Sequence, residues 1–221
     1  MRARFAFLAA AAALAGPAAA SIVPAYQAFF TVDAPGTADD PLITRFVGSH
    51  ILNQSSSRLD ELTLPAAAAL GKSYSNPKWG KTVTAEGRVT RTVYVVPQGI
   101  SSLEVIRGLQ AGLAAKGFKA AYECSADKCG EAFSRLKYYW QDKATLVDGP
   151  GMEVDRARFV PAVFDAPKAV RYALMQRGTG ASAAYAGLYV ALNEGGTNGD
   201  LSDTLTGHVT ALVEIVEPAA S

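Results

Sequence analysis

The chain has 221 residues, with 21 lysines and arginines against 20 aspartates and glutamates and a formal net charge of +1 at pH 7. This length suits one domain, or two small ones, with a substantial hydrophobic core. A near-neutral balance without a lysine- or arginine-rich run argues against a nucleic-acid-binding protein, which needs a basic face.

The first twenty residues, MRARFAFLAAAAALAGPAAA, predict a secretory signal peptide. Arg2 and Arg4 form a positive start, residues 5–15 are apolar, and small residues at 18–20 provide a cleavage site. An apolar run of about 11 residues is too short to span a bilayer, which needs about 20. We therefore expect export, removal of residues 1–20, and no transmembrane segment in the mature chain.

The next part of the chain gives weaker patterns. Residues 21–39 show no clear period and predict a loosely attached lead-in, followed by a single folded domain over residues 40–217. Residues 41–52 (PLITRFVGSHIL) alternate imperfectly between apolar and polar side chains and favour a strand. In residues 66–81, glycine, serine, asparagine and proline stand close together and predict an irregular loop.

Residues 82–97 (TVTAEGRVTRTVYVVP) are the clearest strand in the sequence. Period-two alternation with β-branched residues predicts a half-buried strand whose inner face carries Val83, Ala85, Val89, Val93 and Val95. Gly87 interrupts the pattern, as a bulge or a hairpin turn does.

A helix is predicted directly after this strand. Ser101 and Glu104 have the spacing of a capping box, and Gly117 suits the end of the helix. The expected core-facing side chains are Leu103, Ile106, Leu109, Leu113 and Ala114. Residues 118–124 (FKAAYEC) then predict a return strand.

The second half of the chain predicts one more short helix and three strands. Residues 129–140 favour the helix. Its aromatic stripe consists of Phe133, Leu136, Tyr139 and Trp140. Core packing is the simpler interpretation of this stripe, and a ligand platform is the alternative. The strands are expected at residues 169–176, 182–194 and 208–217, with a turn at 193–203. We therefore predict an α+β fold with a largely antiparallel sheet, one main amphipathic helix and a second short helix.

The two cysteines, Cys124 and Cys129, are separated by four residues. A zinc site needs about four ligands, and His50 and His208 are distant in the sequence. A thioredoxin-like motif has two intervening residues rather than four. Two close thiols in an exported protein favour a structural disulfide, with a redox-active pair and a metal site as alternatives.

The sequence contains no phosphate-binding loop, nucleophile elbow or zinc-protease motif, and we expect no cofactor and no metal. His50 and His208 are the available histidine bases, each in a strand-like segment where a structural role is the simpler interpretation. Carboxylates for glycoside hydrolysis need no fixed spacing, and Asp40, Asp60, Glu61 and Glu86 are available.

The order of several motifs resembles a known family. DPLITRFVGSHI, LDELTLP and the long stretch from AEGRVTRTVYVVP to AAYEC, with CG after the second cysteine, are similar to an uncharacterised domain of Gram-negative envelope proteins. In that family the domain often precedes an OmpA-like peptidoglycan-binding domain. The resemblance covers roughly residues 39–217 and implies a periplasmic protein without a known activity. Because the chain ends at Ser221, we expect no OmpA-like domain here.

Together these observations favour a non-catalytic periplasmic accessory or binding module of the cell envelope, with an envelope protein or glycan as partner. The alternatives are a periplasmic hydrolase that uses carboxylates and a carrier of small molecules or lipids. Tyrosine, tryptophan and arginine dominate binding hot spots, so the candidate binding surface consists of Arg45, Phe46, Arg88, Arg91, Tyr94, Tyr138, Tyr139 and Trp140.

Overall fold

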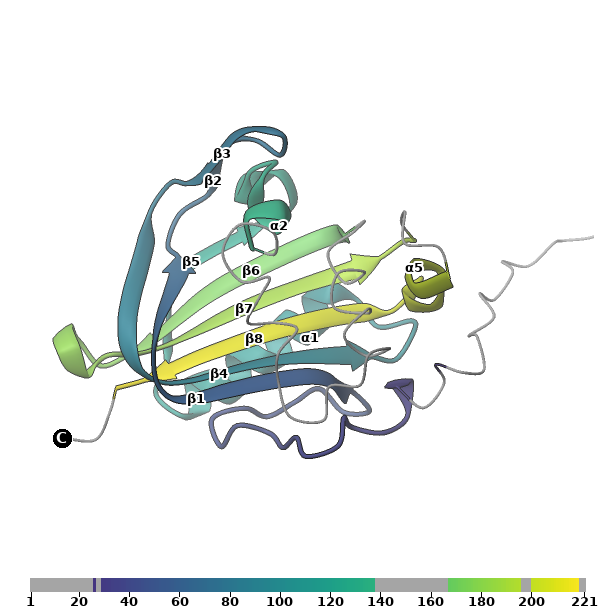
Figure 1. Ribbon diagram of the computed structural model, residues 1–221, viewed down its shortest axis with the longest axis horizontal. Helices are drawn as coiled ribbons and strands as arrows, with labels where there is room; N and C mark the ends of the chain where they lie inside the picture. The colour runs from purple at the N-terminus through teal and green to yellow at the C-terminus, as the bar shows by residue number, and fades with distance from the viewer. Residues whose placement is uncertain (1–25, 27–28, 138–166, 196–199, 219–221) are drawn as a thin grey trace, which may run out of the picture.

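The computed structural model describes residue 26 and residues 29–137, 167–195 and 200–218. The strands are β1 (His50–Pro65), β2 (Ala69–Lys72), β3 (Ser75–Trp79), β4 (Thr82–Val96), β5 (Lys119–Ser125), β6 (Pro167–Arg177), β7 (Ala184–Asn193) and β8 (Val209–Glu217). The helices are α1 (Ser102–Ala115), α2 (Phe133–Arg135) and α5 (Asp200–Leu205), with 3-10 turns η2 (Ala126–Cys129) and η4 (Gly180–Ser182). This part of the chain is rich in sheet and poor in helix (Figure 1).

Six strands form one antiparallel sheet in the order β1-β4-β8-β7-β6-β5. α1 carries the chain from β4 to β5 at the far edge, and the β5-to-β8 meander returns until β8 pairs with β4. Figure 1 shows α1 behind this sheet and α2 in front of it. The expectation of a largely antiparallel sheet is confirmed, as are the strands predicted at 82–97, 118–124, 169–176, 182–194 and 208–217.

The sheet has an apolar core on each face. The α1 side contains side chains from the helix and four alternating residues of β8, namely Val209, Ala211, Val213 and Ile215. The opposite side, toward α2, contains residues that include Leu64, Val89, Val93, Phe133, Tyr172, Tyr189 and Leu212. The period-two assignments for β4 and β8 are therefore confirmed. The predicted inner face of β4 packs on the α2 side of the sheet, and that of β8 packs on the α1 side.

The capping box of α1 is confirmed. Ser101 Oγ accepts a hydrogen bond from the Glu104 backbone N–H (3.2 Å), and the Glu104 carboxylate accepts one from the Ser101 N–H (3.4 Å). Gly117 follows the helix with φ +85°, a conformation that favours glycine.

The buried face of α1 is rotated from the predicted one. Leu103 is 44% exposed and Ala114 is also exposed, so these two assignments were wrong. Val105 and Gln110 are buried instead. The amide of Gln110 donates to Glu123 on β5 (2.6 Å), which satisfies a polar group at the helix–sheet interface.

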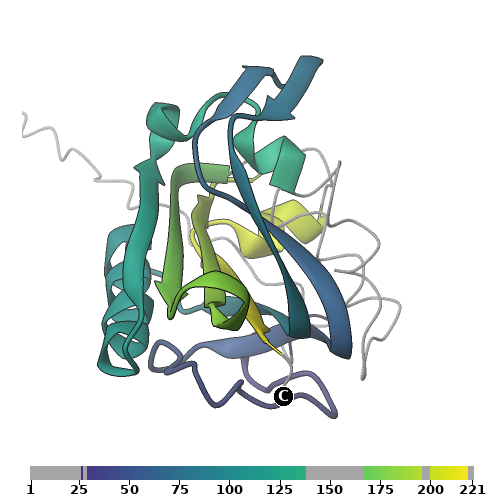
Figure 2. The same cartoon turned by 90° about the vertical axis from the view of Figure 1, so that its left-hand side faces the viewer.

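Residues 66–81 are not an irregular loop, because β2 and β3 form a two-stranded antiparallel hairpin. β1 continues well beyond the predicted residue 52, and its pairing with β4 runs from His50↔Val95 to Pro65↔Thr82. The long, curved β1–β4 pair therefore carries the hairpin beyond the end of the six-stranded sheet, as Figure 2 shows.

Gly87 is neither a turn nor the bulged residue of β4. The two irregularities in this ladder lie on β1, between Ile51 and Asn53 and between Ser57 and Asp60. A Cβ atom at position 87 would lie 1.9 Å from the carbonyl oxygen of Glu217. Glycine is required here because the end of β8 approaches the β4 backbone closely.

The segment before β1 differs from both expectations. Residues 41–49 form turns rather than a strand, with the Ile43 N–H donating to the Asp40 carbonyl (2.8 Å). The described part of the lead-in is tied to β1, since the Ala34 N–H donates to the Ile51 carbonyl (2.8 Å). The Leu42 N–H also donates to the Asp40 carboxylate (2.9 Å), and local side-chain hydrogen bonds of this kind compete with strand pairing.

The turn predicted at 193–203 includes the start of α5, and residues 196–199 lie outside the described residues. None of the helices in the described ranges has the length and apolar character that a membrane crossing requires.

Candidate binding cleft

Arg45 and Tyr94, from the predicted binding surface, meet on the α1 side of the sheet. Arg45 donates to both carboxylate oxygens of Asp33 (2.7 and 2.8 Å) and to Asp39 (2.6 Å). The hydroxyl of Tyr94, a residue only 2% exposed, donates to Asp39 (2.9 Å). The hydrogen bond with Arg45 lowers the pKa of Asp33, and burial raises the pKa of Tyr94. This cluster holds the lead-in against β4.

Arg88 and Phe46 also serve the fold. Arg88 pairs with the buried Asp40 (2.8 Å) and with Glu217 at the end of β8. The hydrogen bond that Arg88 donates to the Asp40 carboxylate raises the pKa of the Arg88 guanidinium. Phe46 is partly buried and packs against the α1-side core.

Arg91 lies on the opposite face of β4, because its position differs in parity from Arg88 and Tyr94. It is 8% exposed, and its Nε atom is 3.7 Å from a carboxylate oxygen of Glu214. Tyr138, Tyr139 and Trp140 lie outside the described residues. The structure therefore does not gather the described candidates Arg45, Phe46, Arg88, Arg91 and Tyr94 onto one exposed surface.

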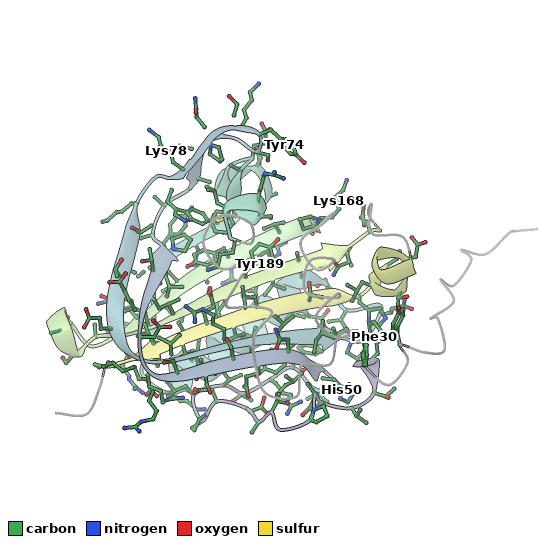
Figure 3. The ribbon with its side chains drawn as sticks, viewed as in Figure 1. Phe30, His50, Tyr74, Lys78, Lys168 and Tyr189 are labelled. Atoms are coloured by element: carbon green, nitrogen blue, oxygen red, sulfur yellow. A yellow bond between two sulfur atoms is a disulfide. The ribbon has the colours of Figure 1, made fainter. Side chains whose placement is uncertain are left out.

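A cleft of about 480 Å³ lies where the β2–β3 hairpin meets the disulfide-closed turn. Its walls come from the hairpin tip, η2, α2 and the start of β6, and the lining residues are Ser73, Tyr74, Ala126, Asp127, Cys129, Gly130, Glu131, Phe133, Ser134, Arg135, Pro167, Lys168, Ala169 and Val170. Figure 3 shows Tyr74 on the hairpin and Lys168 at the start of β6, on the same side of the molecule as α2.

Tyr74 and Arg135 form the most distinctive pair in this cleft. The guanidinium of Arg135 lies 4.1 Å from the centre of the Tyr74 ring, while Tyr74 is 85% exposed. The Arg135 cation covers part of the ring and leaves the rest of it open to solvent. Neither residue was predicted from the sequence, although an aromatic side chain in GKSYSNPKWGK, among turn formers, is a signal of exposure.

The scaffold around the pair is braced at several points. Cys124 and Cys129 form the predicted disulfide, and the Ser73 hydroxyl donates to the Glu131 carbonyl (2.9 Å). The Trp79 and Phe133 rings meet edge to face, with centroids 5.2 Å apart. These contacts fix the hairpin relative to the turn, which pre-organises the cleft.

Replacing both cysteines by serine is expected to lower the free energy of unfolding by about 2 kcal/mol, because the disulfide closes only a short loop. The sheet should remain folded, since its ladders do not depend on this bond. Urea unfolding measures the difference, with reduced wild-type protein as the matched comparison. Complete unfolding of the variant, or two free thiols in the exported wild type, would contradict this role.

The lining of the cleft suits polar recognition. It carries charges of both signs: Asp127 and Glu131 are acidic, and Arg135 and Lys168 are basic. Lys168 lies 3.8 Å from the carboxylate of Glu194, an exposed pair of small energetic value.

The lining of the cleft contains no histidine, and the Ser134 hydroxyl is hydrogen-bonded to the hydroxyl of Tyr189 (2.8 Å). The described residues contain no group of three or more metal-ligating side chains.

Of the acidic residues considered for hydrolysis, three lie together on the β1–β4 pair, and Asp40 precedes β1. Asp40 is buried beside Arg88, and Asp60 lies 4.0 Å from Arg91. Glu61 and Glu86 are paired positions of β1 and β4, and both are exposed. None of the four lines the cleft at the hairpin.

His208 is a buried residue at the start of the last strand, 6% exposed. Its Nδ1 lies 2.8 Å from the Val96 carbonyl oxygen and donates to it, and the ring of Phe30 lies 4.9 Å away, centroid to centroid. Burial lowers the pKa of His208 below its usual range. His208 therefore has a structural role, in keeping with the simpler interpretation of its sequence.

The free energy of unfolding should accordingly fall as the pH is lowered below about 6.5. In this range His208 binds a proton in the unfolded chain more readily than in the folded protein, where its pKa is lowered. The loss begins at the unfolded pKa and continues down to the lowered folded pKa. Urea unfolding between about pH 7.5 and 5 measures it. His208→Asn should flatten this dependence; a slope equal to that of wild type would contradict the assignment.

Comparison with models of known protein families and with curated protein sequences finds no significant match to this chain.

Proposed function

We propose that this chain is a non-catalytic binding module of the bacterial cell envelope, exported to the periplasm, whose α+β domain holds an envelope protein or glycan. The single observation that carries the proposal is the exposed Tyr74 ring beside the Arg135 guanidinium, in a braced cleft. Tyrosine and arginine are enriched at binding hot spots, and a rigid frame lowers the entropic cost of binding.

Further support comes from the polar character of the cleft. Its carboxylates, hydroxyls and cations can hydrogen-bond a peptide or a sugar, and the open part of the Tyr74 ring can stack on either. A hydrolase requires a paired acid and base at one place, and the acids considered from the sequence lie apart from this cleft. On the face opposite α1, the Phe133, Tyr172 and Tyr189 rings pack together, which favours a filled core over a carrier's cavity.

Site-specific photocrosslinking in intact cells tests the proposal. A photoreactive amino acid at Tyr74 should capture one reproducible envelope protein, or glycan fragments, identified by mass spectrometry. The matched control is the same amino acid at Leu59, which is 66% exposed on β1 but does not line the cleft.

Arg135→Ala should reduce capture from position 74 without reducing export or the thermal stability of the main sheet. Equal capture from positions 74 and 59, or no capture from either, would refute the cleft as a binding site. Turnover of an envelope glycan or ester by the purified protein would instead favour the hydrolase.

A further inference from the structure

The outer face of the β2–β3 hairpin has a different character from the cleft beneath it. The hairpin forms a separate two-stranded sheet and projects beyond the main sheet in both ribbon views (Figures 1 and 2). It is joined to the body through its inner face, where the paired residues Ala69 and Trp79 point toward the core. The outer face is left to solvent.

The outer face combines cations with an apolar side chain. Leu70 is directly opposite Lys78 in the hairpin, and Leu70 is 48% exposed. Lys72 is exposed near the hairpin turn, and Lys81 is exposed two residues beyond the end of β3, at the base of the hairpin. Figure 3 shows Lys78 extending away from the body of the protein.

The hairpin and the residues that flank it carry no acidic side chain of their own. No acidic residue occurs between Glu61 and Glu86 in the sequence, although the whole chain has a formal net charge of only +1. Within the described part of the chain, Lys72, Lys78 and Lys81 form no ion pair with a carboxylate. The rest of the chain is therefore net negative, and residues 62–85 carry three lysines without an acidic residue.

Three classes of partner or role can be compared for such a face. Protein interfaces are depleted of lysine, so a protein partner fits poorly. Lysines also protect exposed strand edges from aggregation, which explains the charges but not the exposed leucine among them. Anionic lipid surfaces attract basic segments, and lysine stems with a neighbouring apolar side chain suit the headgroup region.

We propose that the outer face of the β2–β3 hairpin docks on an anionic lipid surface. Lys72, Lys78 and Lys81 contact headgroup phosphates, and Leu70 enters the headgroup–acyl boundary. Docking places the neighbouring cleft close to the membrane. This inference does not depend on the partner proposed for the cleft, and the two fail in different experiments.

Vesicle co-sedimentation of the purified mature chain tests the proposal. Wild type should bind vesicles of phosphatidylglycerol mixed into phosphatidylcholine, bind phosphatidylcholine alone much more weakly, and dissociate at high salt. Loss of one lysine should weaken partitioning about fivefold, and K72Q/K78Q/K81Q about 100-fold. Leu70→Ser should also weaken vesicle binding relative to wild type, although it leaves the charge of the protein unchanged.

The matched control is R58Q/R107Q/K119Q, which removes three exposed cations from β1, α1 and β5. Its binding should stay close to that of wild type, and circular dichroism should show that all variants remain folded. Equal binding to both vesicle types, or an equal loss in the control, would overturn the proposal. Aggregation of K72Q/K78Q/K81Q with unchanged vesicle binding would show that the lysines only prevent aggregation of the exposed strand edges.

Discussion

Glu214→Gln is expected to lower the free energy of unfolding by about 3–5 kcal/mol, because it removes the carboxylate from a buried cluster of charges. Glu214 and Lys137 form an ion pair in which both side chains are fully buried. Arg91 lies opposite Glu214 in the β4–β8 ladder, 3.7 Å from the carboxylate. The variant leaves the Arg91 and Lys137 cations near each other without the anion between them.

Lys137→Met should cost less than Glu214→Gln, since Arg91 remains beside the carboxylate of Glu214. Urea unfolding of the two single variants and the double variant gives their coupling energy, which should be well above zero. A loss below about 1 kcal/mol for Glu214→Gln would mean that the cluster is hydrated rather than desolvated.

The surroundings of this carboxylate explain the glycine opposite it. Gly187 pairs with Glu214 in the β7–β8 ladder. A Cβ atom at position 187 would lie 2.8 Å from Leu64 Cδ2 and 3.4 Å from a Glu214 carboxylate oxygen. Absence of a side chain on β7 therefore leaves room for the charged group within an otherwise apolar core.

Gly130→Ala is expected to lower the free energy of unfolding by roughly 2–4 kcal/mol and to displace the hairpin from the disulfide turn. Gly130 has φ +93°, in a region that other residues rarely adopt. Its Cβ would lie 2.2 Å from the Ala69 carbonyl oxygen, so backbone must move. Because Gly130 lines the cleft, capture of the partner by a photoreactive amino acid at position 74 should fall as well.

Gly99→Ala is the matched control for this prediction. Gly99 also has a positive φ, +83°, but no atom lies within 4 Å of the position that a Cβ atom would occupy there. Its replacement should cost only the conformational strain, about 1 kcal/mol. Hydrogen exchange in β2 and β3 should increase in Gly130→Ala and not in Gly99→Ala; equal effects would show that the close approach to Ala69 is unimportant.

The residues changed in these two predictions belong to the frame on which the proposed cleft is built. Lys137 lies two residues after α2 and ties the end of this short helix to Glu214 on β8. Gly130 allows the turn before α2 to approach β2. A helix of three residues has little stability of its own, so these contacts hold Arg135 in place beside Tyr74.

Local patterns in the sequence determined much of the sheet and of α1. The alternation of Val89, Val93 and Val95, and that of β8, correctly indicated which side chains share a face, because period two depends only on the chain's own geometry. The capping box at Ser101 and the Cys124–Cys129 disulfide were also predictable, since each involves groups within a few residues of one another.

Only the tertiary structure decided the remaining features. The polar stretch QSSSRLDE became strand because β4 pairs with it, and the β2–β3 hairpin has too few inward residues, Ala69 and Trp79, to show a period. The Tyr74–Arg135 pair and the Arg91–Glu214–Lys137 cluster join positions far apart in the chain. Such contacts depend on strand order and on the path of the crossover, and local propensity carries no information about either.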